Sequence, residues 1–533
     1  MNRNRLLFIG LDAADADLIE QWCSEGSLPN ISRFKAKGTW GRLKTTAEIF
    51  HVSAWPSIFT GTMPDKHGLY HAYVMRHGHQ GLLRPRPDES PFPFLWKLLS
   101  DRGKRSVVID AFLTCPIQGL NGIQIVDWGS WSWFWEPTMV PASLRREVRR
   151  RFGRYPADDH SKVGMTPVSD VGTFRRKLLD GVEKKTDVVR WLLGREDWDL
   201  FLVVFGEAHP AGHYFWHLHD QSYITHPRED PKGADALRAV YMALDQAIGE
   251  LLEHVDSSTT VMLVSGDGMA ANYSGSHLLP DVLTRMGVLN GGATAAVGQS
   301  AAGNRARTTP SDVLSTLRNM VPERFRAAVS QRLLSRQVQE QLSLRWKTAG
   351  IVWPQTRAFV IENANEGYIR VNLKGREPEG IVLPGADYDL LCEEISRTAR
   401  TMVNPATGKA AALAVYKIDE LFTGPCRSHM PDVVIAWNPD ARVTTELLME
   451  KYGLVRVASP SCGTAPFYTG NHWPNAFAAA IGPGVPQGMT LHGGSILDLA
   501  PTILAEFGVE APDYMDGRVL RELSAGPRVD VPA

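Results

Sequence analysis

Two histidines four residues apart, His209 and His213, follow an apolar run of strand length. This spacing puts both imidazoles on one face if a helix begins there, and Pro210 suits the first turn of such a helix. Imidazoles that converge in this way bind transition metals such as zinc. A third histidine, His472, stands in the polar stretch TGNHWPN, which we interpret as a loop. An HxxxH pair alone is weak evidence, so its value depends on what else lies nearby.

Carboxylates end two other apolar runs. Asp12 closes LLFIGLD, and Asp267 follows VMLVSG. Ligands of open α/β sheets bind outside the carboxyl ends of the strands, so these aspartates and the histidines are expected at one sheet edge. Glu207, at the end of another apolar run, is a fourth ligand, a partner that orients an imidazole, or a solvated carboxylate. The predicted metal ligands are Asp12, His209, His213, Asp267 and His472.

The elements that must position these residues follow an alternating pattern. Apolar runs of strand length alternate with amphipathic stretches of helix length, and several runs are apolar on both faces. This pattern is typical of an α/β sheet covered by helices on each side. Helices are predicted over 17–25 and 237–254. The predicted strands are 6–12, 106–112, 199–207, 261–268, 432–437 and 476–482.

Two regions depart from this alternation. Residues 128–188 begin with WGSWSWFWEP and continue into RREVRRRFGR, and residues 290–352 are polar, Arg-rich and helix-forming. We predict a cap insertion over the first and a helical insertion over the second. The basic run is expected to be a solvated helix face, and the aromatic cluster to be packing or a lid. Residues 524–533 are expected to be a disordered tail. The catalytic core is predicted to comprise 1–127, 189–289 and 353–523.

Composition excludes several classes of protein. The 533 residues carry 57 Lys and Arg against 58 Asp and Glu, which excludes a broadly basic binder of nucleic acid polymers. The hydrophobic share of 44% excludes wholesale disorder. Five scattered cysteines without a CxxC pair argue against a disulfide framework and a thiolate zinc site. The absence of a signal peptide or membrane span predicts a cytoplasmic protein without a membrane partner. The oligomeric state is not indicated.

Longer motifs resemble a known family. GLDAADADLIEQWCSEGSLPNISRF, SAWPSIFTGTMPDKHGLY, SGDGMAANYSG and GNHWPNAFAAAIGPGV are similar to segments of type I phosphodiesterases/nucleotide pyrophosphatases, a branch of the alkaline phosphatase superfamily. The resemblance extends from residue 6 to about residue 520. It implies an alkaline-phosphatase-like α/β fold, with a central, mostly parallel sheet, helices on both faces and cap insertions. It also implies two metal positions, usually zinc, beside a Ser or Thr nucleophile that attacks phosphorus or sulfur in line.

Four positions depart from the family pattern. His51 stands at the nucleophile position, nine residues before Thr60, and Ser53 offers a hydroxyl two residues away. His209 replaces the Asp of Asp-x-x-x-His, and SGDG replaces Ser-Asp-His-Gly, so that Asp267 takes the place of the His and the preceding Asp is lost. Three of these changes introduce another metal-binding or nucleophilic group, which favours retained metal binding over a decayed scaffold. The predicted catalytic residue is His51, as nucleophile, general base or additional ligand.

These residues predict a metal-dependent hydrolase or transferase. Its substrate would be a phosphate, phosphodiester or sulfate ester of a small molecule. One or two divalent ions are expected, with zinc favoured and iron or copper as alternatives: the first at His209, His213 and His472, and the second at Asp12 and Asp267, where His51 could be a third ligand. A divergent member that runs non-hydrolytic or redox biosynthetic chemistry, and a non-catalytic ligand-binding protein, are the rival hypotheses. His67, in the turn PDKHG, is expected to be structural.

Overall fold

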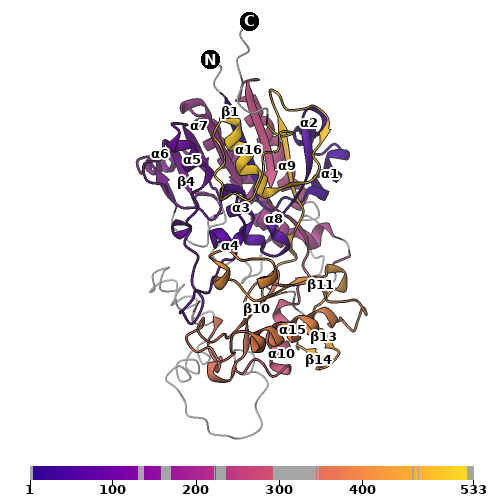
Figure 1. The fold of residues 1–533 in the computed structure, drawn as a ribbon. Coiled ribbons are helices and arrows are strands. Elements are labelled where there is room, and N and C mark those ends of the chain that lie inside the picture. The colour runs from indigo at the N-terminus through magenta and orange to yellow at the C-terminus, as the bar shows by residue number, and fades with distance from the viewer. Residues whose placement is uncertain are drawn as a thin grey trace.

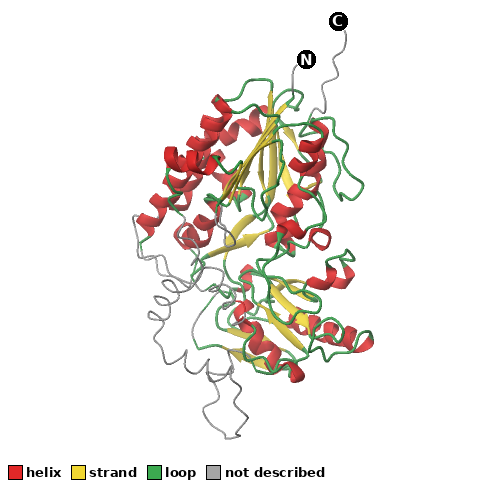
Figure 2. Cartoon of the chain, turned by 90° about the vertical axis from the view of Figure 1, so that its left-hand side faces the viewer, coloured by secondary structure: helices red, strands yellow, loops and turns green. Residues whose placement is uncertain are grey.

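The two larger sheets of the computed structural model lie one above the other along the molecule (Figures 1 and 2). It describes residues 4–129, 137–157, 170–220, 222–223, 236–291, 344, 347–458, 461, 463–465 and 467–524. Within these ranges, no helix combines the length and the apolar character that crossing a bilayer requires.

The larger sheet has ten strands within the described residues, in the order β17-β2-β16-β7-β1-β6-β3-β4-β5, with β18 beside β2. Its centre, β7-β1-β6-β3-β4, is parallel, whereas β16 and β5 run antiparallel to their neighbours. The mostly parallel sheet that the sequence predicts is therefore confirmed. In chain order the strands are β1 (Arg5–Leu11), β2 (Thr39–Lys44), β3 (Ser106–Ile109), β4 (Gly122–Val126), β5 (Thr138–Val140), β6 (Leu200–Phe205), β7 (Thr259–Ser265), β16 (Ala476–Ile481), β17 (Met489–Thr490) and β18 (Gly494–Ser495).

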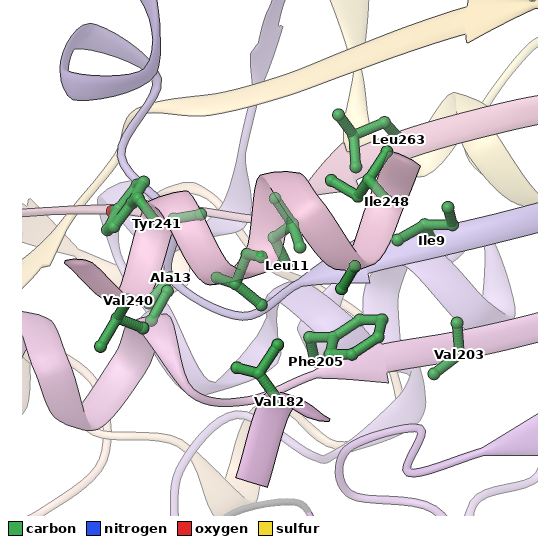
Figure 3. Packing of buried hydrophobic residues seen from close by; sticks show 14 of the residues in the cluster. Ile9, Leu11, Ala13, Val182, Val203, Phe205, Val240, Tyr241, Ile248 and Leu263 are labelled. Atoms are coloured by element: carbon green, nitrogen blue, oxygen red, sulfur yellow. The ribbon is translucent and has the colours of Figure 1, made fainter. Parts of the chain in front are cut away.

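Helices cover both faces of this sheet because its central strands are apolar on both sides. In β1, Leu7 and Ile9 belong to the core on one face, and Leu6 and Phe8 to the core on the other. Figure 3 shows the first of these cores, where Ile9 lies among residues of β6, β7, α7 and α9. The first face is covered by α1 (Ala16–Ser24), α2 (Pro29–Lys37), α6 (Leu144–Phe152), α7 (Val171–Arg195), α8 (Ala208–His219) and α9 (Ala236–Glu253). The second face is covered by α3 (Ala54–Thr60), α5 (Leu95–Asp101) and α16 (Leu499–Glu506).

The second sheet is antiparallel and has its own core. Its order is β11-β12-β10-β9, and a hairpin of β13 and β14 lies beside it. The predicted strand 432–437 is a strand, β12, but it belongs to this sheet and not to the larger one. An apolar run predicts burial and does not identify the partner strand. The elements are β9 (Ala358–Ile361), β10 (Gly367–Val371), β11 (Ala412–Lys417), β12 (Val433–Trp437), β13 (Glu446–Met449), β14 (Gly453–Arg456), α10 (Leu279–Arg285) and α15 (Ala386–Thr401).

The two predicted insertions differ in how much of them is described. In the first, β5 extends the large sheet and α7 packs against α9, while the arginines of α6 lie on its exposed side. The basic run is thus a solvated helix face. Residues 130–136 of the aromatic cluster, nearly all of 290–352 and the tail after 524 lie outside the described residues. The proposed division into a core and two insertions stays a prediction.

Candidate metal and catalytic site

Three neighbouring parallel strands deliver four of the candidate residues to one sheet edge. Asp12 follows β1, Asp267 follows β7, and α8 begins shortly after β6 with His209 and His213 one turn apart. Because β1 pairs with both β6 and β7, their carboxyl ends meet. His472 lies in β15 (Gly470–Trp473), which pairs with β8 (Gly268–Ala271) directly after Asp267. The stretch expected to be a loop is therefore a short strand.

Two of the histidines are held by aspartates. The Nδ1 atom of His209 lies 2.9 Å from Oδ2 of Asp12, and Nδ1 of His472 lies 2.6 Å from Oδ2 of Asp267. A carboxylate that accepts from Nδ1 leaves the lone pair of a neutral ring on Nε2. Asp12 is fixed in turn by the Trp55 indole, whose Nε1 donates to its Oδ1 at 2.6 Å. Carboxylate–histidine pairs of this kind commonly orient metal-binding imidazoles.

The third histidine is held by the backbone. His213 donates from Nδ1 to the carbonyl oxygen of Gly470 at 2.8 Å, and its ring stacks on Tyr468 with the centroids 3.8 Å apart. Its Nε2 lies 3.0 Å from Nε2 of His209. One ligand atom from each of the three histidines falls within 4.8 Å of the others: His209, His213 and His472.

Burial determines the charge state of this cluster. It lowers the pKa of His213 and of His472 well below the usual value, and nearby histidines lower both further, so both rings are neutral. Burial also raises the pKa of Asp267 well above its usual value, and the charges of Asp12 and Glu366 add to this. Neutral imidazoles beside crowded carboxylates are a donor set that suits a divalent cation. The residues present therefore fit a metal ion.

His51 lies against this cluster. It begins the 3₁₀ turn His51–Ser53 that leads into α3, and its ring stacks on His472 with the centroids 4.3 Å apart. The Nδ1 atom of His51 lies 2.9 Å from Oε2 of Glu366, and its backbone N–H donates to Oε1 at 3.2 Å. The pair is nearly enclosed, because the side chains are 11% and 4% exposed.

Glu366 is the site residue that the sequence did not reveal. It precedes β10 of the second sheet and accepts further hydrogen bonds from Asn363, Asn365 and Tyr368 at 2.6, 3.0 and 3.1 Å. Burial alone would raise its pKa, but His51, a backbone hydrogen bond and the hydrogen bond from Asn363 hold the pKa below the usual value. A single Glu beside an apolar run is a common pattern, so no local signal could have identified it.

The alternative nucleophile, Ser53, is committed elsewhere. Its side chain is buried. Its hydroxyl lies 2.6 Å from the carbonyl oxygen of Phe50 and 2.7 Å from Oγ1 of Thr46, so it can donate to either oxygen. The turn that presents His51 therefore directs the serine hydroxyl into the protein.

Glu207 serves a different cluster. Its Oε1 accepts from the Tyr155 hydroxyl at 2.6 Å and lies 3.7 Å from Nζ of Lys185. Lys185 also lies 3.1 Å from Oδ2 of Asp110, and all three charged side chains are fully buried. The carboxylate is thus part of the packing beneath α8 and does not orient an imidazole.

His67 has the structural role expected for it. Its Nδ1 accepts from the backbone N–H of Leu69 at 3.0 Å, and its Nε2 lies 3.0 Å from Oγ of Ser57 in α3. Burial lowers the pKa of His67 to about 3, so the ring is neutral. It links the turn after α3 to the helix itself.

The family assignment rests on a match along most of the chain. The family model described as type I phosphodiesterase/nucleotide pyrophosphatase matches residues 6–461. The chain belongs to this family. The resemblance within the alkaline phosphatase superfamily is thereby confirmed, and membership supports a phosphoester hydrolase. No curated protein sequence matches the chain.

Solved structures resemble the chain over nearly its whole length at low identity. Human ectonucleotide pyrophosphatase/phosphodiesterase 5 has 9% identity and a TM-score of 0.46, covering 96% of this chain and 97% of that one. Phosphonoacetate hydrolase from Sinorhizobium meliloti 1021, in complex with phosphonoformate, has 11% identity and a TM-score of 0.46, with coverages of 93% and 94%. The inactive murine ectonucleotide pyrophosphatase/phosphodiesterase 5 in complex with AMP has 10% identity, a TM-score of 0.46 and coverages of 96%.

Proposed function

We propose that the protein is a metal-dependent hydrolase of a phosphate, phosphodiester or sulfate ester of a small molecule. The observation that carries this proposal is the convergence of three imidazoles, each held at Nδ1, next to the His51–Glu366 pair. Family membership supports the reaction class. This member departs from the family pattern at the nucleophile position and at the metal-ligand positions.

The metal would be held by the Nε2 atoms of His209, His213 and His472. Zinc suits three nitrogens with an open position, and a bound zinc ion supplies electrophilic stabilisation of the oxygens around phosphorus or sulfur. Asp12 and Asp267 accept from two of these imidazoles, which supports a role in orienting them. Their direct coordination of a second ion stays a prediction, and metal stoichiometry tests it.

His51 would act as the general base. Its Nδ1 is held by Glu366, which leaves Nε2 to take a proton from the attacking water as the water oxygen bonds to phosphorus. The carboxylate stabilises the imidazolium that forms, as in other His–carboxylate pairs. The bond from phosphorus to the alcohol oxygen breaks, and the proton is returned to that oxygen. Attack by His51 itself is the competing role, and it would leave a phosphohistidine.

Hydrolysis of 4-nitrophenyl esters tests this proposal. After zinc loading, the protein should hydrolyse 4-nitrophenyl phosphate, its diester or its sulfate, and His51→Gln should lower kcat by about 100-fold or more. The matched control is His492→Gln, because His492 is exposed. An absence of turnover on all three esters, or a His51→Gln variant with full activity, contradicts the proposal. Protein quenched in alkaline detergent, in which a phosphohistidine is stable, would carry that group if His51 were the nucleophile and not the base.

Redox chemistry is a second candidate. It is favoured by the three-nitrogen donor set and by the inward-facing Ser53 hydroxyl, since neither belongs to the usual phosphodiesterase site. Three-nitrogen sites also suit iron or copper. Purified protein that holds iron or copper, and that hydrolyses no ester with any metal, would favour this candidate over the first.

A further inference from the structure

A cavity of about 220 Å³ lies beside the candidate site. Its walls come from both halves of the molecule: the antiparallel pair of β8 and β15 next to the large sheet, and β11 and β12 of the second sheet. His472 and Glu366 line it as well, so the cavity is continuous with the metal cluster and with the partner of His51. Any ester whose phosphorus lies at the metal cluster could extend its organic group into this space.

Four aromatic side chains line the cavity. They are Tyr273, Tyr416, Trp437 and Trp473. The Trp437 indole is fixed, because its Nε1 donates to Oγ of Ser276 at 3.1 Å and its ring packs against the backbone of Gly275, where a Cβ would lie 2.6 Å away. A rigid aromatic wall offers apolar contact without a large entropic cost of ordering it.

The charge of the lining disfavours anions. None of the described residues that line the cavity is a lysine or an arginine, whereas Glu48 and Glu366 are both acidic. Burial raises the pKa of Tyr416, and the negative charge of Glu48 raises it further. A second phosphate or a carboxylate placed here would meet carboxylates, neutral rings and the polar side chains of Asn272, Ser274, Asn365 and Asn471, with no cation among the described lining residues to pair with it.

We infer that this cavity binds the uncharged, apolar alcohol group of the substrate, of about the size of one aromatic ring. This inference rests on the proposed ester hydrolysis and specifies its substrate class. The size is set by volume, because a cavity of about 150 Å³ is large enough for benzene. The second sheet thereby contributes specificity, while the large sheet holds the reacting group.

Binding of non-hydrolysable phosphonates to the zinc-loaded full-length protein tests the inference, with calorimetry as the readout. Phenylphosphonate should bind about tenfold more tightly than methylphosphonate, because its ring fills the cavity. The probe 4-carboxyphenylphosphonate should lose that advantage, because it places an anion near Glu48. These comparisons need no variant and no turnover.

A cavity-filling variant provides the second arm. Ala414 of β11 lines the cavity and is half-buried, so Ala414→Leu should reduce the advantage of phenylphosphonate to within about threefold while methylphosphonate binding is unchanged. The matched control is Ala410→Leu, because Ala410 is exposed and lies outside the lining. This variant should still bind phenylphosphonate about tenfold more tightly than methylphosphonate.

The outcomes separate the two proposals. If methylphosphonate binds and phenylphosphonate gains nothing, the cavity inference is wrong and the metal centre stands. If 4-carboxyphenylphosphonate binds most tightly, the inference is also wrong, because the cavity then prefers an anion. If no phosphonate binds, the proposed function is contradicted, and the inference falls with it.

Discussion

Glu366 holds both the ring and the backbone N–H of His51: both carboxylate oxygens lie within 3.1 Å of Nδ1, and Oε1 also accepts from the N–H. Three further donors, from Asn363, Asn365 and Tyr368, fix the carboxylate itself. A buried carboxylate that accepts so many hydrogen bonds stays ionised and rigid. At the scale of single residues, His51 is therefore not an isolated substitution at the nucleophile position of the family pattern. A network of hydrogen bonds around Glu366 fixes its ring.

Removing the charge of Glu366 should weaken catalysis by His51 without changing the shape of the side chain that holds it. Glu366→Gln should lower kcat by about 100-fold or more with little change in KM, because the imidazolium of His51 loses its stabilising partner. The control is Glu362→Gln, a more exposed glutamate that pairs with Lys347. Steady-state kinetics on a 4-nitrophenyl ester give the answer, and an unchanged kcat contradicts the role.

His67 should make stability depend on pH. Its folded-state pKa of about 3 lies below the unfolded value of about 6.5, so its contribution is present above pH 6.5 and is lost as the pH falls. Between pH 7 and pH 5 the wild type should lose about 2 kcal/mol more unfolding free energy than His67→Asn, which keeps an acceptor for Leu69. Urea unfolding of both proteins at both pH values measures this difference, and equal losses contradict it.

The residues that the sequence could predict are those whose position follows from strand ends. Asp12, Asp267 and the pair on α8 follow apolar runs that became β1, β7 and β6, so the convergence of parallel strands was sufficient to bring them together. Glu366 comes from the antiparallel sheet, whose placement depends on contacts between distant segments. Local sequence carries no information of that kind.

At the scale of elements, a buried ionic cluster joins α7 to the large sheet. Lys185 donates to the carbonyls of Gly129 and Val204 at 2.7 and 3.0 Å and faces the carboxylates of Asp110 and Glu207. Glu207 immediately precedes α8, which carries two of the candidate metal-site histidines. The cluster thus anchors the helix that the site depends on.

Removing the cation from this cluster should lower the stability of the protein. Lys185→Met leaves two carboxylates buried without their cation, and we expect the free energy of unfolding to fall by about 3–5 kcal/mol. Lys184→Met is the matched control, because the neighbouring Lys184 makes an exposed contact to the Arg154 carbonyl. Urea denaturation compares the three proteins, and a Lys185→Met variant as stable as the control contradicts the anchoring role.

Element boundaries show where sequence patterns were insufficient. The polar stretch around His472 looked like a loop, yet it forms β15 because the β8 backbone supplies its hydrogen bonds. The apolar run of β12 had the composition of a central strand but pairs with β10 and β11. In both cases pairing with a distant strand decided the outcome, and composition did not.

At the scale of the whole molecule, the two sheets contribute different parts of the candidate site. The large sheet brings the candidate metal-site residues to its carboxyl edge. The second sheet, which lies below it in Figure 2, supplies two walls of the aromatic cavity, and Glu366 directly precedes its strand β10. A substrate would therefore lie where the two halves meet. The family resemblance predicted the first half of this arrangement, whereas the second required the three-dimensional structure.

Metal content is the measurement that tests the central claim most directly. Purified, zinc-loaded wild-type protein should retain about one ion per chain at the three histidines after exchange into metal-free buffer, and a second ion would add Asp12 and Asp267 as ligands. His213→Ala should lose the ion while His254→Ala, at an exposed position, keeps it. Wild-type protein that retains no metal, or a folded His213→Ala variant that retains as much as the wild type, would contradict the account.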